Sequence, residues 1–173
     1  TFGEETARGF YLRDLGLYFV IGDYFDISLT TSLYTLGSWS VDVNSRYKVN
    51  YKCTGTFAFN FSNDQTGEKG AADFFQSRNF GVKWSHSQDS KAIPGVSFSA
   101  SVNFSSPANS RYNSHSVSEA LQNQISSSIS FSKNWNGKFN LSVNALHSQN
   151  TRDTLCNYSF TLPNVTFSMS RIY

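Results

Sequence analysis

Alternation of apolar and polar residues dominates this sequence and is clearest between Phe80 and Phe104. Aromatic and branched residues occupy every second position of 80–87, and Val96–Phe104 repeats the pattern after a turn at Pro94–Gly95. Because strand side chains point to opposite faces with period two, each run has one apolar and one polar face. The stretch predicts a β-hairpin whose polar face carries mostly Ser and Asn.

The same pattern predicts most of the remaining strands. Residues 25–34, 39–48, 51–61, 125–132, 139–148 and 158–162 alternate in this way. Residues 15–21 are expected to form a first strand, and a last strand begins at Val165 after a turn at Pro163–Asn164. Asn136–Gly137 is a hairpin-turn signal. We expect residues 1–14 to form a loop or an incomplete strand and residues 63–79 and 105–122 to form long, extracellular loops. About ten antiparallel strands in up-and-down order follow, with no helix.

The lengths of the connections between these strands indicate the environment of the sheet. From the fourth strand on, long and short connections alternate, as in outer-membrane barrels with long loops outside and short periplasmic turns. Tyr and Trp lie near many strand ends, where interfacial girdles fall. The longest apolar run, Leu17–Ile21, is far shorter than the roughly 20 residues of a membrane helix. The predicted fold is all-β, an antiparallel up-and-down transmembrane β-barrel. A soluble sandwich or lipocalin-like barrel is the alternative, but its wet face would carry more charge.

In a membrane barrel the apolar face of the sheet contacts lipid, and the polar face lines a water-filled lumen. The residues expected to face lipid are Ile27, Leu29, Val41, Phe57, Phe59, Val82, Phe98, Val102, Ile129, Leu141, Val143 and Phe160. Those expected to line the lumen are Ser28, Thr30, Asp42, Asn44, Arg46, Lys52, Thr54, Thr56, Lys83, Ser99, Ser101, Asn103, Ser128, Ser130, Asn140, Ser142 and Asn144. Small polar side chains predict a wide lumen without a charged selectivity ring.

Composition argues against several other functions. The net charge of +2 is too small to indicate a nucleic-acid partner. His86 and His147 lie near strand ends and His115 in a long loop, but abundant Ser and Asn make a chance Ser–His–Asn grouping easy. We therefore expect no enzymatic activity, metal site or cofactor. Cys53 and Cys156 allow at most one disulfide, and about five strands separate them, which disfavours a bond.

Several segments resemble the barrel of the lipopolysaccharide-assembly outer-membrane protein LptD in its divergent form. They are GFYLRDLGLYFVIGDYFDISLTTSLYTLGSWSV (9–41), WSHSQDSKAIPGVSFSASVNFS (84–105), HSQNTRD (147–153) and LPNVTFSMSRIY (162–173). The WSHSQ and LPN-x-x-F-S-M-S-R-I-Y stretches are the more distinctive ones.

The resemblance implies a translocon that carries lipopolysaccharide to the outer leaflet of the outer membrane. Its partners would be lipopolysaccharide, the outer-membrane bilayer, a plug lipoprotein and a periplasmic bridge protein. The chain departs from a full member in strand number and in lacking an N-terminal periplasmic domain, so we expect an interior fragment of a larger barrel and assign no gate residues. The alternatives are a TonB-dependent transporter or porin barrel, or a small self-contained outer-membrane barrel.

Overall fold

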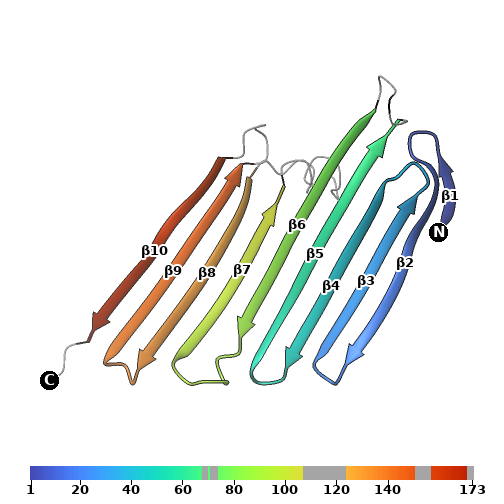
Figure 1. The fold of residues 1–173 in the computed structure, drawn as a ribbon. Coiled ribbons are helices and arrows are strands. Elements are labelled where there is room, and N and C mark those ends of the chain that lie inside the picture. Colours follow the sequence, from blue (N-terminus) through green and yellow to red (C-terminus); the bar gives the residue numbers. More distant parts are fainter. Residues whose placement is uncertain (68–69, 71–73, 107–123, 151–156, 171–173) are drawn as a thin grey trace.

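The chain forms one antiparallel sheet of ten strands in sequence order. The computed structural model describes residues 1–67, 70, 74–106, 124–150 and 157–170. The strands are β1 (Phe2–Glu5), β2 (Gly9–Ile21), β3 (Phe25–Tyr34), β4 (Trp39–Val49), β5 (Cys53–Thr66), β6 (Phe75–Gln88), β7 (Val96–Ser105), β8 (Gln124–Trp135), β9 (Phe139–Asn150) and β10 (Asn157–Met169). They lie side by side in a single layer, with β1 and β10 at opposite ends (Figure 1). The predicted all-β, up-and-down architecture is confirmed as an unclosed sheet, consistent with part of a barrel.

The strands end at two opposite sides of the sheet, and these two sides differ in the connections that they carry. Residues 22–24, 50–52, 89–95 and 136–138 join β2–β3, β4–β5, β6–β7 and β8–β9 at what we call the short-turn edge (Figure 1). The other edge, where β5 ends and β6 begins, is called the long-loop edge. The predicted Asn-Gly turn is at the short-turn edge, with positive φ at Asn136 (49°) and Gly137 (73°). Such left-handed residues match the twist of a hairpin. No helix within the described residues has the length and apolar character needed to span a membrane.

Residues 1–14, expected to be a loop or an incomplete strand, instead form a hairpin. β1 pairs with the first residues of β2, from Phe2 opposite Leu12 to Glu5 opposite Gly9. The Arg13 guanidinium holds this hairpin together, because it lies 2.6 Å from the Glu5 carboxylate and donates a 2.7 Å hydrogen bond to the Tyr34 hydroxyl of β3. Mixed charges, which suggested a loop, here pair across strands.

Two other predicted boundaries were wrong. The expected loop 63–79 is mostly strand, because β5 continues to Thr66 and β6 already begins at Phe75. The expected turn at Pro163–Asn164 is a bulge within β10, where the register against β9 shifts between Thr161 and Asn164. A bulge accommodates proline, which lacks the amide hydrogen that a regular ladder uses. Most of the expected loop 105–122 and of the medium connection after Asn150 lies outside the described residues.

The sheet has no hydrophobic core of the kind a soluble domain needs. Among the described residues, Ala100 and Ile125 are the buried hydrophobic side chains. Large ones stay uncovered, such as Leu17 (57% exposed), Phe160 (73%) and Phe167 (62%). Apolar patches of this extent mark contact with another apolar phase or partner.

Candidate functional site: the polar face of the sheet

The strand register brings the predicted polar residues onto one face. Directly opposed residues of an antiparallel pair project from the same side of the sheet. One row runs Ser28–Asn44–Ala58–Lys83–Asn103 across β3 to β7. A second runs Arg46–Thr56–Ser85–Ser101–Ser128 across β4 to β8.

The other predicted lumen residues join these rows by strand alternation or by pairing. Thr30 pairs with Asp42, Ser99 with Ser130, and Ser130 with Asn144. Thr54, Asn140 and Ser142 lie on the same face by alternation. Lys52 is the exception, because it belongs to the turn before β5. We call this surface the polar face.

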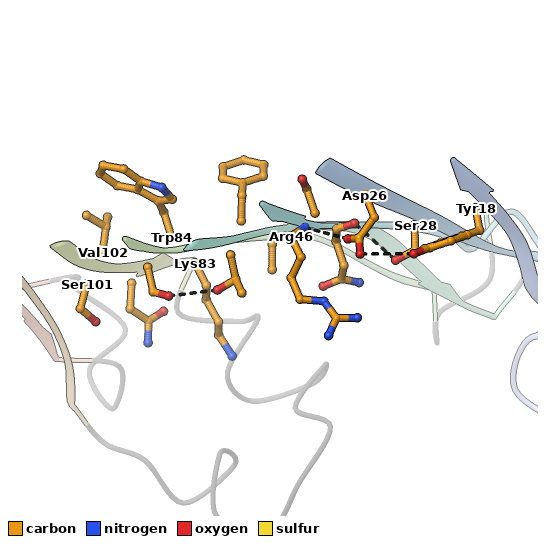
Figure 2. Close-up of a pocket in the computed structure, with 15 residues that line it drawn as sticks. Tyr18, Asp26, Ser28, Arg46, Lys83, Trp84, Ser101 and Val102 are labelled. Carbon is orange, nitrogen blue, oxygen red and sulfur yellow. Dashed lines mark hydrogen bonds between the residues drawn. The ribbon is translucent and has the colours of Figure 1, made fainter. Parts of the chain in front are cut away.

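The predicted apolar residues share the opposite surface, the apolar face. One row is Ile27–Ser45–Phe57–Trp84–Val102, and another is Leu29–Val43–Phe59–Val82–Phe104. Val41, Phe98, Ile129, Leu141, Val143 and Phe160 follow on this face by pairing or alternation. Figure 2 shows the division directly, since Trp84 and Val102 project from one side of the sheet and Lys83 and Ser101 from the other.

A hollow of about 420 Å³ lies on the polar face over β3 to β7 (Figure 2). The Asp26 carboxylate at its rim is well partnered. One oxygen accepts a 3.0 Å hydrogen bond from the Arg46 amide, and the other accepts a 3.2 Å bond from the Tyr18 hydroxyl. The side chains of Arg46 and Lys83 extend away from the sheet on the same side. This part of the polar face therefore presents two cations beside a tethered carboxylate.

The adjoining part of the polar face, over β7 and β8, is uncharged. Cross-strand hydroxyl pairs join Ser97 to Ser132 at 2.8 Å and Ser99 to Ser130 at 2.7 Å. Ser101 faces Ser128 one step further along. These side chains are short and project little from the sheet, and their hydroxyls can donate hydrogen bonds to, and accept them from, water or hydroxyl-rich groups.

Within the described residues, neither His86 nor His147 forms a hydrolytic site. The Ser127 hydroxyl lies 3.4 Å from His147 Nδ1, but it donates a 2.8 Å hydrogen bond to the Asn103 carbonyl. Its hydrogen is therefore directed away from the imidazole, which leaves the hydroxyl without a general base. His86 Nδ1 lies 2.7 Å from the Tyr47 hydroxyl. His115 lies outside the described residues.

The described residues also hold no group of three or more His, Cys, Asp or Glu side chains suited to a metal. Cys53 is a free thiol of intermediate exposure. Cys156 lies outside the described part of the chain, so the expectation about a disulfide stays a prediction.

Sequence analysis missed a buried polar network at the long-loop edge. The fully buried Asn79 donates a 3.0 Å hydrogen bond to Asp64 and accepts one of 3.1 Å from Ser77. Asp64 also receives the Ser62 hydroxyl at 2.9 Å and lies 3.7 Å from Arg8. The signal was the run of amide and hydroxyl residues at the end of β5 and start of β6, which was interpreted as a loop.

Sequence analysis also missed an aromatic cluster on the apolar face. Trp84 Nε1 donates a 3.2 Å hydrogen bond to the Tyr47 hydroxyl, which in turn contacts His86. The Tyr47 ring occupies the space above Gly55, where any Cβ would collide with it. The signal was a glycine at an apolar position of a strand, which often marks a close approach.

Comparison with known proteins agrees with this geometry. The family model described as LptD protein matches residues 1–173. No curated protein and no solved structure matches the chain. The chain therefore belongs to the LptD family, a transport family rather than an enzyme family, which functions in the transport of lipopolysaccharide to the outer membrane.

Proposed function

We propose that this chain is a wall segment of an outer-membrane translocon that delivers lipopolysaccharide to the outer leaflet. The observation that carries the proposal is the division of one sheet into a face rich in Ser, Thr and Asn and an uncovered, mainly apolar face, in a chain of the LptD family. Backbone groups in lipid must all be paired, so such a sheet belongs in a closed barrel. The remaining strand edges of β2 and β10 would pair with further strands.

In this proposal the polar face lines the lumen. The charged hollow around Arg46 and Lys83 and the hydroxyl surface of β7 and β8 would meet the phosphates and sugars of lipopolysaccharide. The apolar face would contact acyl chains of the bilayer. The transport is non-covalent, and partners would be a plug lipoprotein in the lumen and a periplasmic bridge protein.

Family membership favours this function over a TonB-dependent transporter, a porin or a small self-contained barrel. Nothing in the sheet favours one of these alternatives independently.

Site-specific photocrosslinking tests the proposal. A photoreactive amino acid replaces Ser101 or Val102, neighbours that project from opposite faces. In cells that assemble lipopolysaccharide, position 101 should give a lipopolysaccharide adduct and position 102 should give phospholipid adducts. Adducts with lipopolysaccharide at position 102 and none at 101 would overturn the assignment of the faces. Absence of lipopolysaccharide at both positions would count against transport through this segment.

A further inference from the structure

The short-turn edge concentrates lysines. Five lysines lie in its turns or in the adjoining strand ends: Lys48, Lys52, Lys91, Lys133 and Lys138. The carboxylates at this edge are Asp23 and Asp89 in the turns and Asp26 near the start of β3. Five lysines against three carboxylates leave this edge with an excess of two positive charges, equal to the net charge of the whole chain.

These lysines differ from the cations of the long-loop edge in their partners. There, Arg13 pairs with Glu5 at 2.6 Å and Arg8 with Asp64 at 3.7 Å. Within the described part of the chain, none of the five lysines forms an ion pair. Their charge is thus available to an external anion.

Aromatic rings accompany the lysines at the same edge. The Lys133 ammonium lies 4.9 Å from the centroid of the Trp135 ring, and Lys91 lies 5.9 Å from that of Tyr51. Lys133 is on the apolar face, opposite Val96 and two residues beyond Phe131. A lysine on a membrane-facing surface buries its aliphatic chain and extends its ammonium toward the headgroups. The arrangement therefore fits a lipid–water boundary.

A hydrogen-bonded group of Trp84, Tyr47 and His86 lies on the same face. The indole N–H of Trp84 can only donate, so the Tyr47 oxygen accepts that bond and its own hydrogen can reach His86 Nδ1. The His86 ring also packs against Phe98, with centroids 5.2 Å apart. The hydrogen bond and the packing together hold the imidazole in place near the edge.

We propose that the short-turn edge binds phosphate groups of anionic phospholipids in the leaflet that it meets. Lys91, Lys133 and Lys138 supply the charge, the His86 imidazole adds a polar group beside them, and Trp135 packs along the upper acyl chain. Charge complementarity selects this occupant, because unpaired lysines next to amphipathic rings suit a phosphodiester at the membrane surface. The inference rests on the proposed contact of the apolar face with lipid, but not on the passage of lipopolysaccharide.

Native mass spectrometry of the full-length protein tests the inference. The protein is released from detergent in the presence of equimolar phosphatidylglycerol and phosphatidylcholine with identical acyl chains. Phosphatidylglycerol adducts should predominate, and added salt should weaken this preference because it screens surface charge. Each lysine near such a surface contributes about a fivefold preference at low ionic strength.

Matched variants make the test specific. Lys133→Gln should reduce the preference by about fivefold, whereas Lys133→Arg should retain it. Arg78→Gln removes the same charge near the start of β6, at the long-loop edge, and should leave the preference unchanged. Heat-modifiable migration in gels checks that each variant is folded.

Two results would overturn the proposal. One is equal binding of the two lipids by the wild-type protein, which would show that this edge is an ordinary aromatic girdle with no preference for anionic headgroups. The other is unchanged lipid preference in Lys133→Gln together with lost binding to a periplasmic partner protein, which would identify the edge as a protein-docking surface. Because the assay contains no lipopolysaccharide, a negative result leaves the transport proposal untouched. Absence of lipopolysaccharide adducts at position 101 likewise leaves this inference untouched, whereas a reversal of the two faces in the crosslinking experiment would overturn both.

Discussion

Gly55 is expected to tolerate substitution poorly, because its missing side chain makes room for Tyr47. A Cβ at this position would collide with the Cζ and hydroxyl oxygen of Tyr47, and would lie 2.6 Å from the Ser85 carbonyl oxygen of β6. The backbone oxygen cannot move without disturbing the β5–β6 ladder. Gly55→Ala must therefore displace the Tyr47 ring.

Displacing that ring has two costs. Overpacking a closely fitted site costs about 1–3 kcal/mol. Loss of the hydrogen bonds that Tyr47 makes with His86 and Trp84 adds about 1 kcal/mol. We therefore expect Gly55→Ala to lower the free energy of unfolding by about 2–4 kcal/mol.

Urea unfolding of the full-length protein in phospholipid vesicles, followed by tryptophan fluorescence, measures this change. Gly16→Ala in β2 is the matched control, because the nearest atom to its added Cβ would be the Leu29 carbonyl oxygen at an ordinary 3.9 Å. Alanine is about 0.5–1 kcal/mol better than glycine inside a strand, so this control should be neutral or stabilising.

A double-mutant cycle then separates the two contacts of the added methyl group. In a Tyr47→Ala background, Gly55→Ala should lower the free energy of unfolding by at least about 1 kcal/mol less than it does in the wild-type protein. The cost that remains in that background comes from the contact with the Ser85 carbonyl oxygen. The reasoning is refuted if Gly55→Ala is as stable as wild type within about 0.5 kcal/mol, or if both glycine variants change stability equally.

Two further predictions concern the long-loop edge. Asn79→Leu should destabilise the protein by about 2–3 kcal/mol, because it removes the buried amide that donates to Asp64 and accepts from Ser77. The same unfolding assay checks this with the exposed Asn44→Leu as control, and equal effects of the two variants would contradict it. Arg13→Gln should release β1 without unfolding the sheet, because it removes the contacts with Glu5 and Tyr34. Amide hydrogen exchange should become faster in residues 2–5 and stay unchanged in β5. Unaltered exchange in β1 would show that Arg13 does not hold the hairpin.

The sequence predicts the faces of this sheet better than the ends of its strands. The face that a side chain occupies depends on the two-residue period of a strand. The neighbours Lys83 and Trp84 on β6 therefore project from opposite faces. Strand length depends on cross-strand partners that a linear pattern does not reveal. Asn63 and Asn79 look like loop residues, yet hydrogen bonds from Gln76 to Asn63 and from Asn79 to Asp64 keep these segments in the ladder.

The candidate site shows the same division. Sequence alternation groups Arg46 and Lys83 on one face, but only the register of β4, β5 and β6 brings them to one hollow. Pro163 suggested a turn because it breaks a regular ladder, whereas β10 absorbs it in a bulge. The Tyr47–Gly55–His86 contact joins three strands and could not be found without their pairing.

The most direct test of the account is a cysteine scan along β7 in a Cys53→Ser/Cys156→Ser background of the full-length protein. Cysteine at Phe98, Ser99, Ala100, Ser101, Val102 and Asn103 in turn is exposed, in intact outer membranes, to a water-soluble maleimide. We predict labelling at 99, 101 and 103 and protection at 98, 100 and 102, because the first set faces a water-filled lumen and the second faces lipid. Uniform labelling, or labelling of the even positions alone, would contradict the assignment of the two faces on which the proposed function rests.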